Sequence, residues 1–437
     1  MSRNISRRTF IETGAATTMG MTILTPGRAA ADDRTVRIGV VGTGNRGRSL
    51  LGTMLMIKGV EFPALCDVDE GNLALASEMV VSAGRKKPDG YSKGDHAFEK
   101  LMEREDLDAV MIASPWQWHT PMAVHGMKQG KYVGVEVPAA ITTDQCWDLI
   151  NIHEETGMPC MMMENWSFRS DNLAVLNMVR QGMFGDIVHC HSAHSHDCID
   201  HWFFDPQGNI RWGGEFLANR NCDQYPTHSL GPVLSWLDIN CGDYFDYITS
   251  TASESKSINA YFARKFGPNH PNAKRKFKQG DIVTSVVRTK KGRSIVINYD
   301  MQLPRPYDNR WMLQGTLGIY NEQRNALYIE DESPEYHQWE PFPPYMEKYN
   351  HFWYRDSSWF AGIEEGHGGT DALELIVFLN AVRHKTQTPI DVYDSVVMSC
   401  IVGLSEKSIA EGSVPVKVPD FTRGKWKTKK PSFGIEV

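Results

Sequence analysis

The sequence has no long apolar run and no excess of basic residues. No uninterrupted apolar segment approaches the about 18 residues that span a bilayer, so we expect no transmembrane helix in the mature chain. A net charge of −7 argues against nucleic acid or an anionic membrane as the main partner. Internal repeats and low-complexity segments are also lacking. With 437 residues, 41% of them hydrophobic, the chain is predicted to fold as two globular domains.

Paired cysteines are lacking too. The eight cysteines show neither a Cys-x-x-Cys motif nor a regular spacing. A disulfide scaffold is not expected in domains of this size, so most cysteines are predicted to be buried thiols. A single disulfide stays open as an alternative because the N-terminus indicates export.

The N-terminus has the three-part layout of a targeting segment. Arg7 and Arg8 precede Phe10, a weakly apolar stretch follows, and alanines occupy positions 29–31. This pattern predicts a twin-arginine export signal, so residues 1–31 are left out of the predicted fold. The mature protein is then expected in the periplasm or otherwise outside the cytoplasm. The alternative is a disordered arm with a chance Arg-Arg pair.

A glycine-rich turn follows the first predicted strand. Strand 36–41 leads to Gly42, Gly44 and Gly47, a spacing in which the first glycine permits a tight turn. The second lets a pyrophosphate approach the backbone, and the third lets helix and strand pack closely. A second predicted strand ends at Asp67, 20 residues after Gly47. An acid at this place binds the adenosine ribose and repels a 2′-phosphate, so the pattern predicts NAD; the alternative is a surface turn with an unrelated aspartate.

Further apolar strands, near residues 107–115 and 131–138, alternate with helical segments. This alternation indicates a parallel, doubly wound sheet. Trp116 and His119 follow a strand and are expected at the nicotinamide half of the cofactor, with plain packing as the alternative. Residues 32–165 are therefore predicted to form a Rossmann-type NAD-binding domain. Export in the folded state suits a chain that takes up its cofactor first, which predicts tightly held NAD.

Residues 166–437 are predicted to form an α+β domain with a mostly antiparallel open sheet. A helix opens it, with Ser170 or Asp171 as the expected N-cap. Strand-rich segments follow. Two helical segments come next; the one at 368–385 is expected to be amphipathic and to brace the two domains, and the one at 389–413 is a long helix.

The segment "HCHSAHSHDCIDH", residues 189–201, is rich in histidine. On a strand, His189 and His191 share one face, and His194 and His196 share the other face or the next turn. The spacing matches no zinc signature, so no metal is predicted and an acid/base histidine is favoured.

Three other places carry candidate groups. Tyr225 and His228 flank a proline in a segment that enters a helix, with a satisfied structural histidine as the alternative for His228. Tyr307 lies in a proline-rich loop, a location suited to hydroxyl-rich ligands. His367 and two glycines precede a helix.

The motifs "GTGNRG", "CDVD", "PWQWH", "GVEVPAA", "MMMEN", "YPTHSLGP", "PRPY" and "HGGTD" occur in this order along the mature chain. With the twin-arginine leader, they resemble glycoside hydrolase family 109, the NAD-dependent, α-N-acetylgalactosaminidase-type branch of the Gfo/Idh/MocA oxidoreductases. The resemblance implies a glycoside substrate and NAD that is not consumed. Besides the glycines, it implies cofactor contacts from Asn45, Arg46, Asp67, Trp116, Gln117, Trp118, His119, Glu136, Val137 and Asn165. It implies substrate contacts from Tyr225, Pro226, Thr227, His228 and Tyr307.

The chain departs from the family pattern on the substrate side. His194 stands where the family has a tyrosine, Gly213 stands where an arginine is expected, and the insert before "YPTH" is shorter. On the cofactor side, Val137 replaces the lysine that many sugar dehydrogenases of the superfamily use for proton transfer. Because valine cannot carry a proton, that work is expected to fall to histidines and tyrosines of the second domain.

The resemblance implies oxidation of the sugar at C3, loss of the C2 proton, elimination of the C1 group, addition of water and return of the hydride. Two flanking carboxylates are not required in NAD-dependent glycosidases. We predict that His194 is the base or acid near C1 and C2, that His228 faces the C3 hydroxyl, and that Tyr225 and Tyr307 contact hydroxyls.

Two alternatives stay open. One is an exported sugar oxidoreductase that forms or uses 3-keto sugars, and the other is a non-catalytic, NAD-containing sugar-binding protein. A dimer or higher oligomer is expected because open antiparallel sheets of this kind often pair face to face.

Overall fold

The computed structural model describes residues 34–355 and 369–436. The twin-arginine segment and His367 lie outside these residues. Across the described part of the chain, every helix is too short or too polar to span a membrane. All eight cysteines are described, and each is a free thiol rather than half of a disulfide.

The first sheet has six strands in the order β3-β2-β1-β4-β5-β6, and each neighbouring pair is parallel. The strand order reverses between β1 and β4, so the loops after these two strands lie next to each other at one edge. The predicted parallel, doubly wound sheet is confirmed. Its strands are β1 (Val36–Val41), β2 (Val60–Cys66), β3 (Asp89–Tyr91), β4 (Ala109–Ile112), β5 (Tyr132–Val135) and β6 (Cys160–Met162).

Local sequence explains where the helices between these strands begin and end. In α5, the Thr142 side chain accepts a hydrogen bond from the Gln145 N–H, and Gly157 ends the helix at a φ of 71°. Trp116 to His119, expected just past a strand end, form the first turn of α4. The helices are α1 (Asn45–Met56), α2 (Glu70–Ser82), α3 (Ala97–Met102), α4 (Trp116–Lys128) and α5 (Thr143–Thr156).

The second sheet has nine strands in the order β14-β13-β12-β11-β7-β10-β9-β8-β15. The β7–β10 pair is parallel and the other pairs are antiparallel, so the mostly antiparallel sheet is confirmed. Its strands are β7 (Ile187–Ser195), β8 (Phe245–Ala252), β9 (Val283–Thr289), β10 (Ser294–Asp300), β11 (Met312–Gly315), β12 (Gly318–Asn321), β13 (Ala326–Ile329), β14 (Glu340–Pro341) and β15 (Val416–Lys417).

Two expectations about helices of this half were wrong. Helix α6 has Arg169 at its cap position and no side-chain cap, so Ser170 lies inside the helix. Helix α13 is not amphipathic, because 12 of its 15 residues are buried. It packs against α1, β1 and η1, and these contacts together cover both of its faces. The helical segments are η1 (Asn165–Phe168), α6 (Ser170–Arg180), η2 (Ile199–Phe203), α7 (Trp212–Asn219), α8 (Thr227–Trp236), α9 (Ser257–Lys265), α10 (Pro271–Lys274), α11 (Pro343–Lys348), α12 (Phe352–Arg355), α13 (Thr370–His384), α14 (Val392–Ala410) and η5 (Lys425–Lys427).

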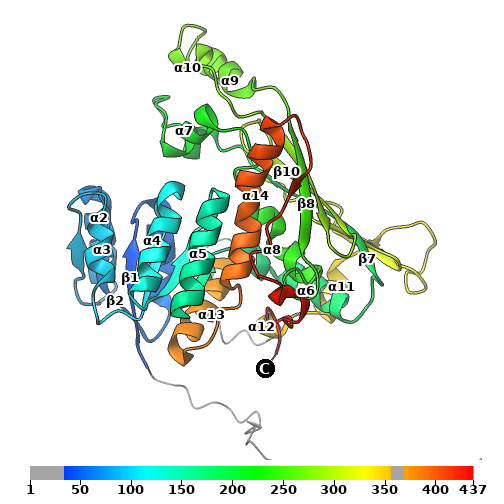
Figure 1. Cartoon of the computed structure of the whole chain (residues 1–437), viewed down its shortest axis with the longest axis horizontal. Helices are drawn as coiled ribbons and strands as arrows, with labels where there is room; N and C mark the ends of the chain where they lie inside the picture. The colour runs from blue at the N-terminus through cyan, green and yellow to red at the C-terminus, as the bar shows by residue number, and fades with distance from the viewer. Residues whose placement is uncertain (1–33, 356–368, 437) are drawn as a thin grey trace, which may run out of the picture. The chain divides into compact units, whose positions relative to one another are not determined.

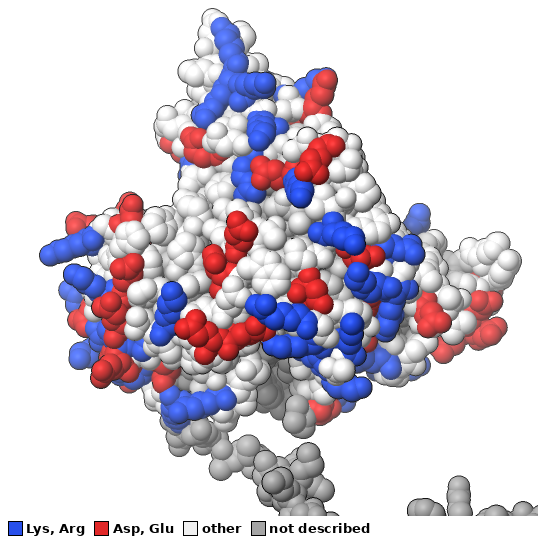
Figure 2. Space-filling view, in the orientation of Figure 1, with Lys and Arg blue, Asp and Glu red and all other residues white. Residues whose placement is uncertain are grey.

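Helix α14 joins the two sheets and lies between α5 and β8 (Figure 1). Four of its serines accept hydrogen bonds from backbone N–H groups, two in each half of the chain. The pairs are Ser395–Met162, Ser399–Ala139, Ser405–Asp223 and Ser408–Ser250, at 2.9–3.1 Å. Buried apolar side chains of both halves belong to one continuous cluster. On the outside, acidic and basic side chains are intermixed over the face seen in Figure 2, which agrees with the modest net charge.

Candidate functional site

The glycine turn after β1 is closed by protein on one side and open on the other. Gly42 has a φ of 84°, and a Cβ on Gly47 would lie 1.9 Å from the carbonyl oxygen of Gly42. Gly44 occupies the cap position of α1, and a Cβ there would meet no heavy atom within 4 Å. No side chain caps α1, so the backbone N–H groups of its first turn are available to a phosphate. The turn therefore fits the pyrophosphate of a dinucleotide.

Asp67, predicted to bind the ribose, follows β2 and borders this turn. Its Oδ2 accepts a hydrogen bond from the Thr43 N–H at 2.6 Å, and its Oδ1 accepts from the Asp69 N–H at 2.9 Å. These bonds hold the carboxylate in a fixed orientation next to the phosphate turn, as a ribose contact requires.

Three more predicted cofactor residues meet around one buried acid. Arg46 donates from Nε to Glu136 at 2.6 Å and from Nη1 to Asp371 at 2.6 Å. Asn165 donates from Nδ2 to the other oxygen of Asp371 at 2.7 Å. Asp371 comes from α13, far along the chain, and was not among the predicted site residues.

Glu374, one turn after Asp371, adds a second buried acid to this cluster. Burial and the charge of Asp371 raise the pKa of Glu374 well above its usual value. Neither of its carboxylate oxygens has a hydrogen-bond partner within the described residues. Glu374 is thereby kept neutral and adds no charge, so the cluster sets the carboxylates of Glu136 and Asp371 against the single guanidinium of Arg46. This arrangement suits a positively charged nicotinamide ring.

The first turn of α4, which follows β4, carries four more of the predicted cofactor residues. Both ring nitrogens of His119 lie within 2.8 Å of backbone carbonyl oxygens, those of Ser114 and Pro138, and burial lowers the pKa of His119. The ring of Trp118 packs against those of Phe98 in α3 and of His96 just before this helix. Gln117 is exposed. Trp116 is the one that reaches the second half, with its ring 5.7 Å from that of Tyr225. Val137 is buried beside these residues.

A carboxylate–imidazole pair stands where the two halves meet. Glu164 follows β6 and is fully buried, and its Oε1 lies 2.7 Å from Nδ1 of His228 in the first turn of α8. Glu164 also accepts hydrogen bonds from the Trp166 and Ser167 N–H groups and from the Ser167 hydroxyl. A carboxylate that only accepts fixes the hydrogen of His228 on Nδ1 and leaves Nε2 able to take a proton.

Gly231 makes this close pairing possible. It lies one turn after His228 in α8, where a Cβ would sit 1.7 Å from the Oε2 of Glu164. Any side chain at this position would therefore displace the carboxylate from His228.

The predicted substrate residues surround His228. The rings of Tyr225 and His194 lie 4.9 and 5.1 Å from its ring, and Tyr307 lies 5.5 Å from His194. The hydroxyl of Tyr307 is 3.5 Å from Nδ1 of His194. The structure thus brings together residues from three distant segments of the chain, and the Trp166 ring lies 5.7 Å from that of Tyr307.

Burial keeps His194, Tyr225 and Tyr307 uncharged. Burial, together with His228 and His196, lowers the pKa of His194 well below its usual value. Burial also raises the pKa of Tyr225 and of Tyr307. These groups therefore act as neutral hydrogen-bond donors and acceptors at neutral pH, which suits the hydroxyls of a sugar.

The remaining predicted substrate residues and departures lie at the border of the cluster. Pro226 caps α8, and the hydroxyl of Thr227 is buried without a partner among the described residues. Gly213 lies in α7, and a Cβ there would come within 2.7 Å of Trp202, so Trp202 fills the space of the expected arginine. The ring of Trp202 packs 5.1 Å from Tyr225.

Four residues of the site were not predicted from the sequence: Glu164, Trp166, Trp202 and Asp371. One signal existed for Glu164, because an acid directly after a parallel strand lies at the ligand-binding edge of such a sheet. Nothing in the local sequence marks Trp202. Asp371 ends the quoted motif "HGGTD", but the motif did not reveal its role, because the packing of distant segments brings Asp371 to Arg46.

Family models match both halves of the chain. The model of the oxidoreductase family, NAD-binding Rossmann fold, matches residues 36–164. The model of glycosyl hydrolase 109, C-terminal domain, matches residues 168–428, more than half of the chain. The protein belongs to glycosyl hydrolase family 109. It is an NAD-dependent glycosidase of that family, which agrees with the dinucleotide turn and the carboxylate–imidazole pair.

Curated relatives of this family 109 glycosidase align over nearly the whole chain. The α-N-acetylgalactosaminidase of Tannerella forsythia is 39% identical over 426 residues, which cover 93% of this chain and 90% of the relative. A glycosyl hydrolase family 109 protein of Stenotrophomonas maltophilia is 38% identical over 452 residues, which cover 99% of both.

Solved structures share the fold of the family 109 chain at low identity. Levoglucosan dehydrogenase in complex with NADH superposes with a TM-score of 0.66 at 17% identity, covering 88% of this chain and 100% of that one. Myo-inositol dehydrogenase from Lactobacillus casei, in complex with NAD(H) and myo-inositol, gives a TM-score of 0.60 at 15% identity, covering 89% and 99%.

Proposed function

We propose that this protein hydrolyses a glycoside of an N-acetylated hexose by transient oxidation at C3, elimination of the C1 group, addition of water and reduction at C3. The Glu164–His228 pair supports this proposal because it places a base beside the NAD-binding half. The relative from Tannerella forsythia, named an α-N-acetylgalactosaminidase, supports the choice of sugar class.

The cofactor's nicotinamide supplies a hydride acceptor and donor when bound. Among the described residues, the open backbone at Gly44 and the start of α1 would hold its phosphates, and Asp67 would hold its adenosine ribose. The acid cluster around Arg46 would face its charged ring. Val137 keeps this region apolar and offers no proton donor.

His228 would take the proton of the C3 hydroxyl as that carbon is oxidised. Its Nδ1–H is bonded to Glu164, so Nε2 is the free acceptor, and the buried carboxylate stabilises the imidazolium that forms. When C3 is reduced again, the same imidazolium returns the proton. The pair thus performs the work that a lysine at position 137 would otherwise do.

Tyr225 and Tyr307 would bind the other hydroxyls. His194 would take the proton lost from C2 and pass it to the C1 leaving group, and in the reverse sense it would take a proton from the added water as C2 is protonated again. The contact between Tyr307 and His194 aligns both groups toward one place, where the C1 and C2 side of the sugar would lie. Because Trp202 occupies the space next to Gly213, contacts to the substituents of the sugar differ from those of an arginine-bearing relative.

We also propose that the chain is exported through the twin-arginine pathway with NAD already bound and retained. Two contacts support retention of the cofactor, because they build the cofactor region from both halves of the chain. Asp371 of α13 binds Arg46, and Ser399 of α14 accepts a hydrogen bond from the Ala139 N–H. Protein purified from the periplasm and desalted should contain about one NAD per chain, measured after acid release of the nucleotide.

The deciding experiment is an aryl-glycoside panel assayed with and without added NAD. Hydrolysis predicts release of the aryl alcohol from an N-acetylated hexoside with no net accumulation of NADH. Accumulating NADH would instead identify a dehydrogenase, and sugar binding without either product would identify a binding protein. A His189→Ala variant is the control for the site, and it should release the aryl alcohol like the unaltered protein. His189 bonds to Ser294 and lies on the face of β7 opposite to His194.

A further inference from the structure

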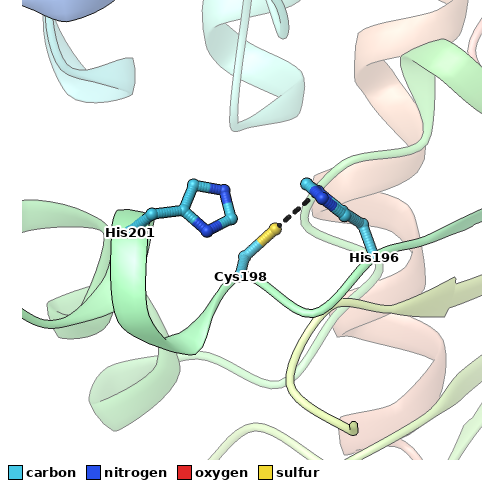
Figure 3. Close-up of side chains that lie close together, drawn as sticks. All are labelled: His196, Cys198 and His201. Carbon is cyan, nitrogen blue, oxygen red and sulfur yellow. Dashed lines mark hydrogen bonds between the residues drawn. The ribbon is translucent and has the colours of Figure 1, made fainter. Parts of the chain in front are cut away.

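Three potential metal ligands lie together just after β7. The side chains of His196, Cys198 and His201 place one ligand atom each within 4.8 Å of one another (Figure 3). The Cys198 Sγ is 3.1 Å from Nδ1 of His196. Cys198 is buried, whereas His201 is exposed and gives access from solvent.

The backbone of each of these residues is fixed by a hydrogen bond to a neighbouring segment. The N–H groups of His196 and Cys198 donate to the carbonyl oxygens of Asp300 and Met301, at 2.8 and 3.0 Å. The carbonyl oxygen of His201 accepts from Arg211 at 2.9 Å. These hydrogen bonds hold the backbone of all three residues in place around the candidate ion position.

A π-helical turn explains the unusual spacing of the ligands. The Phe203 N–H donates to the carbonyl of Cys198, five residues back, at 3.2 Å, and η2 begins directly after Cys198. This wide turn brings His201 back over Cys198. Because the ligands come from a strand end and a π-turn, their spacing matches no common zinc signature, and such turns are frequent at functional sites.

The acidic residues of this segment are engaged elsewhere. Asp197 accepts a hydrogen bond from the Ile199 N–H at 3.3 Å, and Asp200 contacts Tyr261 and Lys265 of α9. The ligand set offered is thus two imidazoles and one thiolate. That set is typical of zinc and other borderline-soft transition metals rather than of magnesium or calcium.

We propose that His196, Cys198 and His201 bind a zinc ion next to the substrate-binding cluster. Tetrahedral zinc with Zn–S of about 2.3 Å and Zn–N of about 2.0–2.1 Å needs ligand atoms about 3.3–3.6 Å apart. The Sγ of Cys198 and the Nδ1 of His196 are 3.1 Å apart, and the ligand atom of the exposed His201 ring lies within 4.8 Å of both residues' ligand atoms. As the Sγ–zinc bond forms, the thiol proton leaves to solvent, with no change of oxidation state.

Three protein ligands leave a fourth position open on the ion. The ring of His196 lies 5.0 Å from that of Tyr307, so the open position is close to the substrate cluster and can take water or a sugar hydroxyl. The ion would also fix the turn that carries Trp202, which packs against Tyr225. The site thereby links a metal to the shape of the sugar-binding region.

The test is metal binding by the full mature chain, purified with a tag that contains no histidine and stripped with chelator. Added Zn²⁺ should bind with one equivalent per chain in calorimetry. Added Co²⁺ should give the near-ultraviolet thiolate-to-metal absorption band of a cysteine-bound ion. Cys198→Ser should abolish that band, and His201→Ala should weaken zinc binding by more than about 100-fold, since even changes outside the ligand shell cost ~10–100-fold.

Two controls keep the outcome interpretable. Cys241→Ser and His96→Ala alter a cysteine and an exposed histidine outside this cluster, and both should bind zinc like the unaltered protein. His201 is exposed, so its alanine variant should melt at the same temperature as the metal-free protein. Absence of stoichiometric zinc uptake, or a cobalt band that survives in Cys198→Ser, would overturn the proposal. The readout needs no substrate, so it is independent of the proposed glycosidase reaction.

Discussion

The cofactor half and the substrate half of the site are built by different means. Around β1 the site is made of backbone, where Gly42, Gly44 and Gly47 shape a turn and the start of α1. Around α8 the site is made of side chains, since Glu164 and His228 come from different halves of the chain and meet at 2.7 Å. A backbone site tolerates little change of residue type, whereas a side-chain site can exchange its groups one at a time.

This difference indicates which half of the site can accept changes of residue type within the family. The departures expected from the sequence resemblance, at His194 and Gly213, both fall in the side-chain half, where Trp202 lies against Gly213. The backbone half keeps every glycine of its motif. Variants placed in each half should therefore separate cofactor binding from turnover.

The largest effect is expected from His228→Ala. Turnover of an aryl N-acetylhexosaminide should fall by about 1000-fold, because a general acid–base group contributes roughly 10²–10⁴-fold. NAD content should not change, because the ring belongs to the substrate half. His228→Gln, which can still bond to Glu164, controls for the buried carboxylate. If His228→Ala also lowered the NAD content, variants in the two halves would not separate cofactor binding from turnover.

A second variant tests the cost of burying polar groups in the substrate half. Burial raises the pKa of Asp223 to about 7, and its Oδ2 has no partner among the described residues. Because the folded pKa exceeds the unfolded one, ionisation destabilises the protein progressively from about pH 4 to pH 7. The unfolding free energy of Asp223→Asn, minus that of the wild type, should therefore rise by about 3–4 kcal/mol over this range. Denaturant titrations at both pH values measure it, and a flat difference would contradict the assignment.

A matched glycine pair sharpens the description of the backbone half. Gly47→Ala should destabilise the protein by about 2–3 kcal/mol, because its Cβ would overlap the Gly42 carbonyl. Gly44→Ala should change stability by no more than about 1 kcal/mol, since its Cβ meets no protein atom. It should nevertheless weaken NAD binding by at least about 10-fold, because the methyl group occupies the approach of the phosphates. Calorimetry with NAD and denaturation without it would separate the two; equal NAD affinity in Gly44→Ala and wild type would refute the phosphate assignment.

The smallest effect is expected from Asp67→Asn. Removing the charge should raise the affinity for NADP by about 10-fold, because the 2′-phosphate is no longer repelled. The affinity for NAD should fall by less than that, since the amide oxygen can still accept a hydrogen bond. Competition binding of the two nucleotides gives the ratio, and the turnover of NAD-loaded enzyme serves as the control. An unchanged ratio would show that Asp67 does not contact the ribose region.

The fold could be predicted from sequence because its rules are local. Alternating apolar strands and helices, together with the glycine spacing, indicated the parallel sheet, and strand 36–41 has the predicted bounds. Helix α13 was misjudged because its exposure depends on α1 and η1, which pack on it from distant parts of the chain. Its pattern alone could not show that both faces are covered.

The site could be predicted only in part for the same reason. Tyr225, His228 and Tyr307 carry motifs of their own, and the structure brings them into one cluster with His194. Glu164 was passed over because its partner lies 64 residues away. The grouping of His196, Cys198 and His201 was not predicted, because their spacing depends on a π-turn that no sequence propensity reveals.

Helix α14 also determines whether the two halves of the chain can fold and unfold separately. Its serines bind backbone on both sides of the junction near residue 165, and its apolar side chains lie in the shared core. The boundary between the two family models is therefore a boundary along the chain and not between separable bodies. A fragment that ends at Asn165 would expose the surfaces of α5 and β6 that α14 covers, so it would aggregate rather than bind nucleotide alone. Heating the intact chain should accordingly melt both halves in a single transition, with no surviving nucleotide-binding unit.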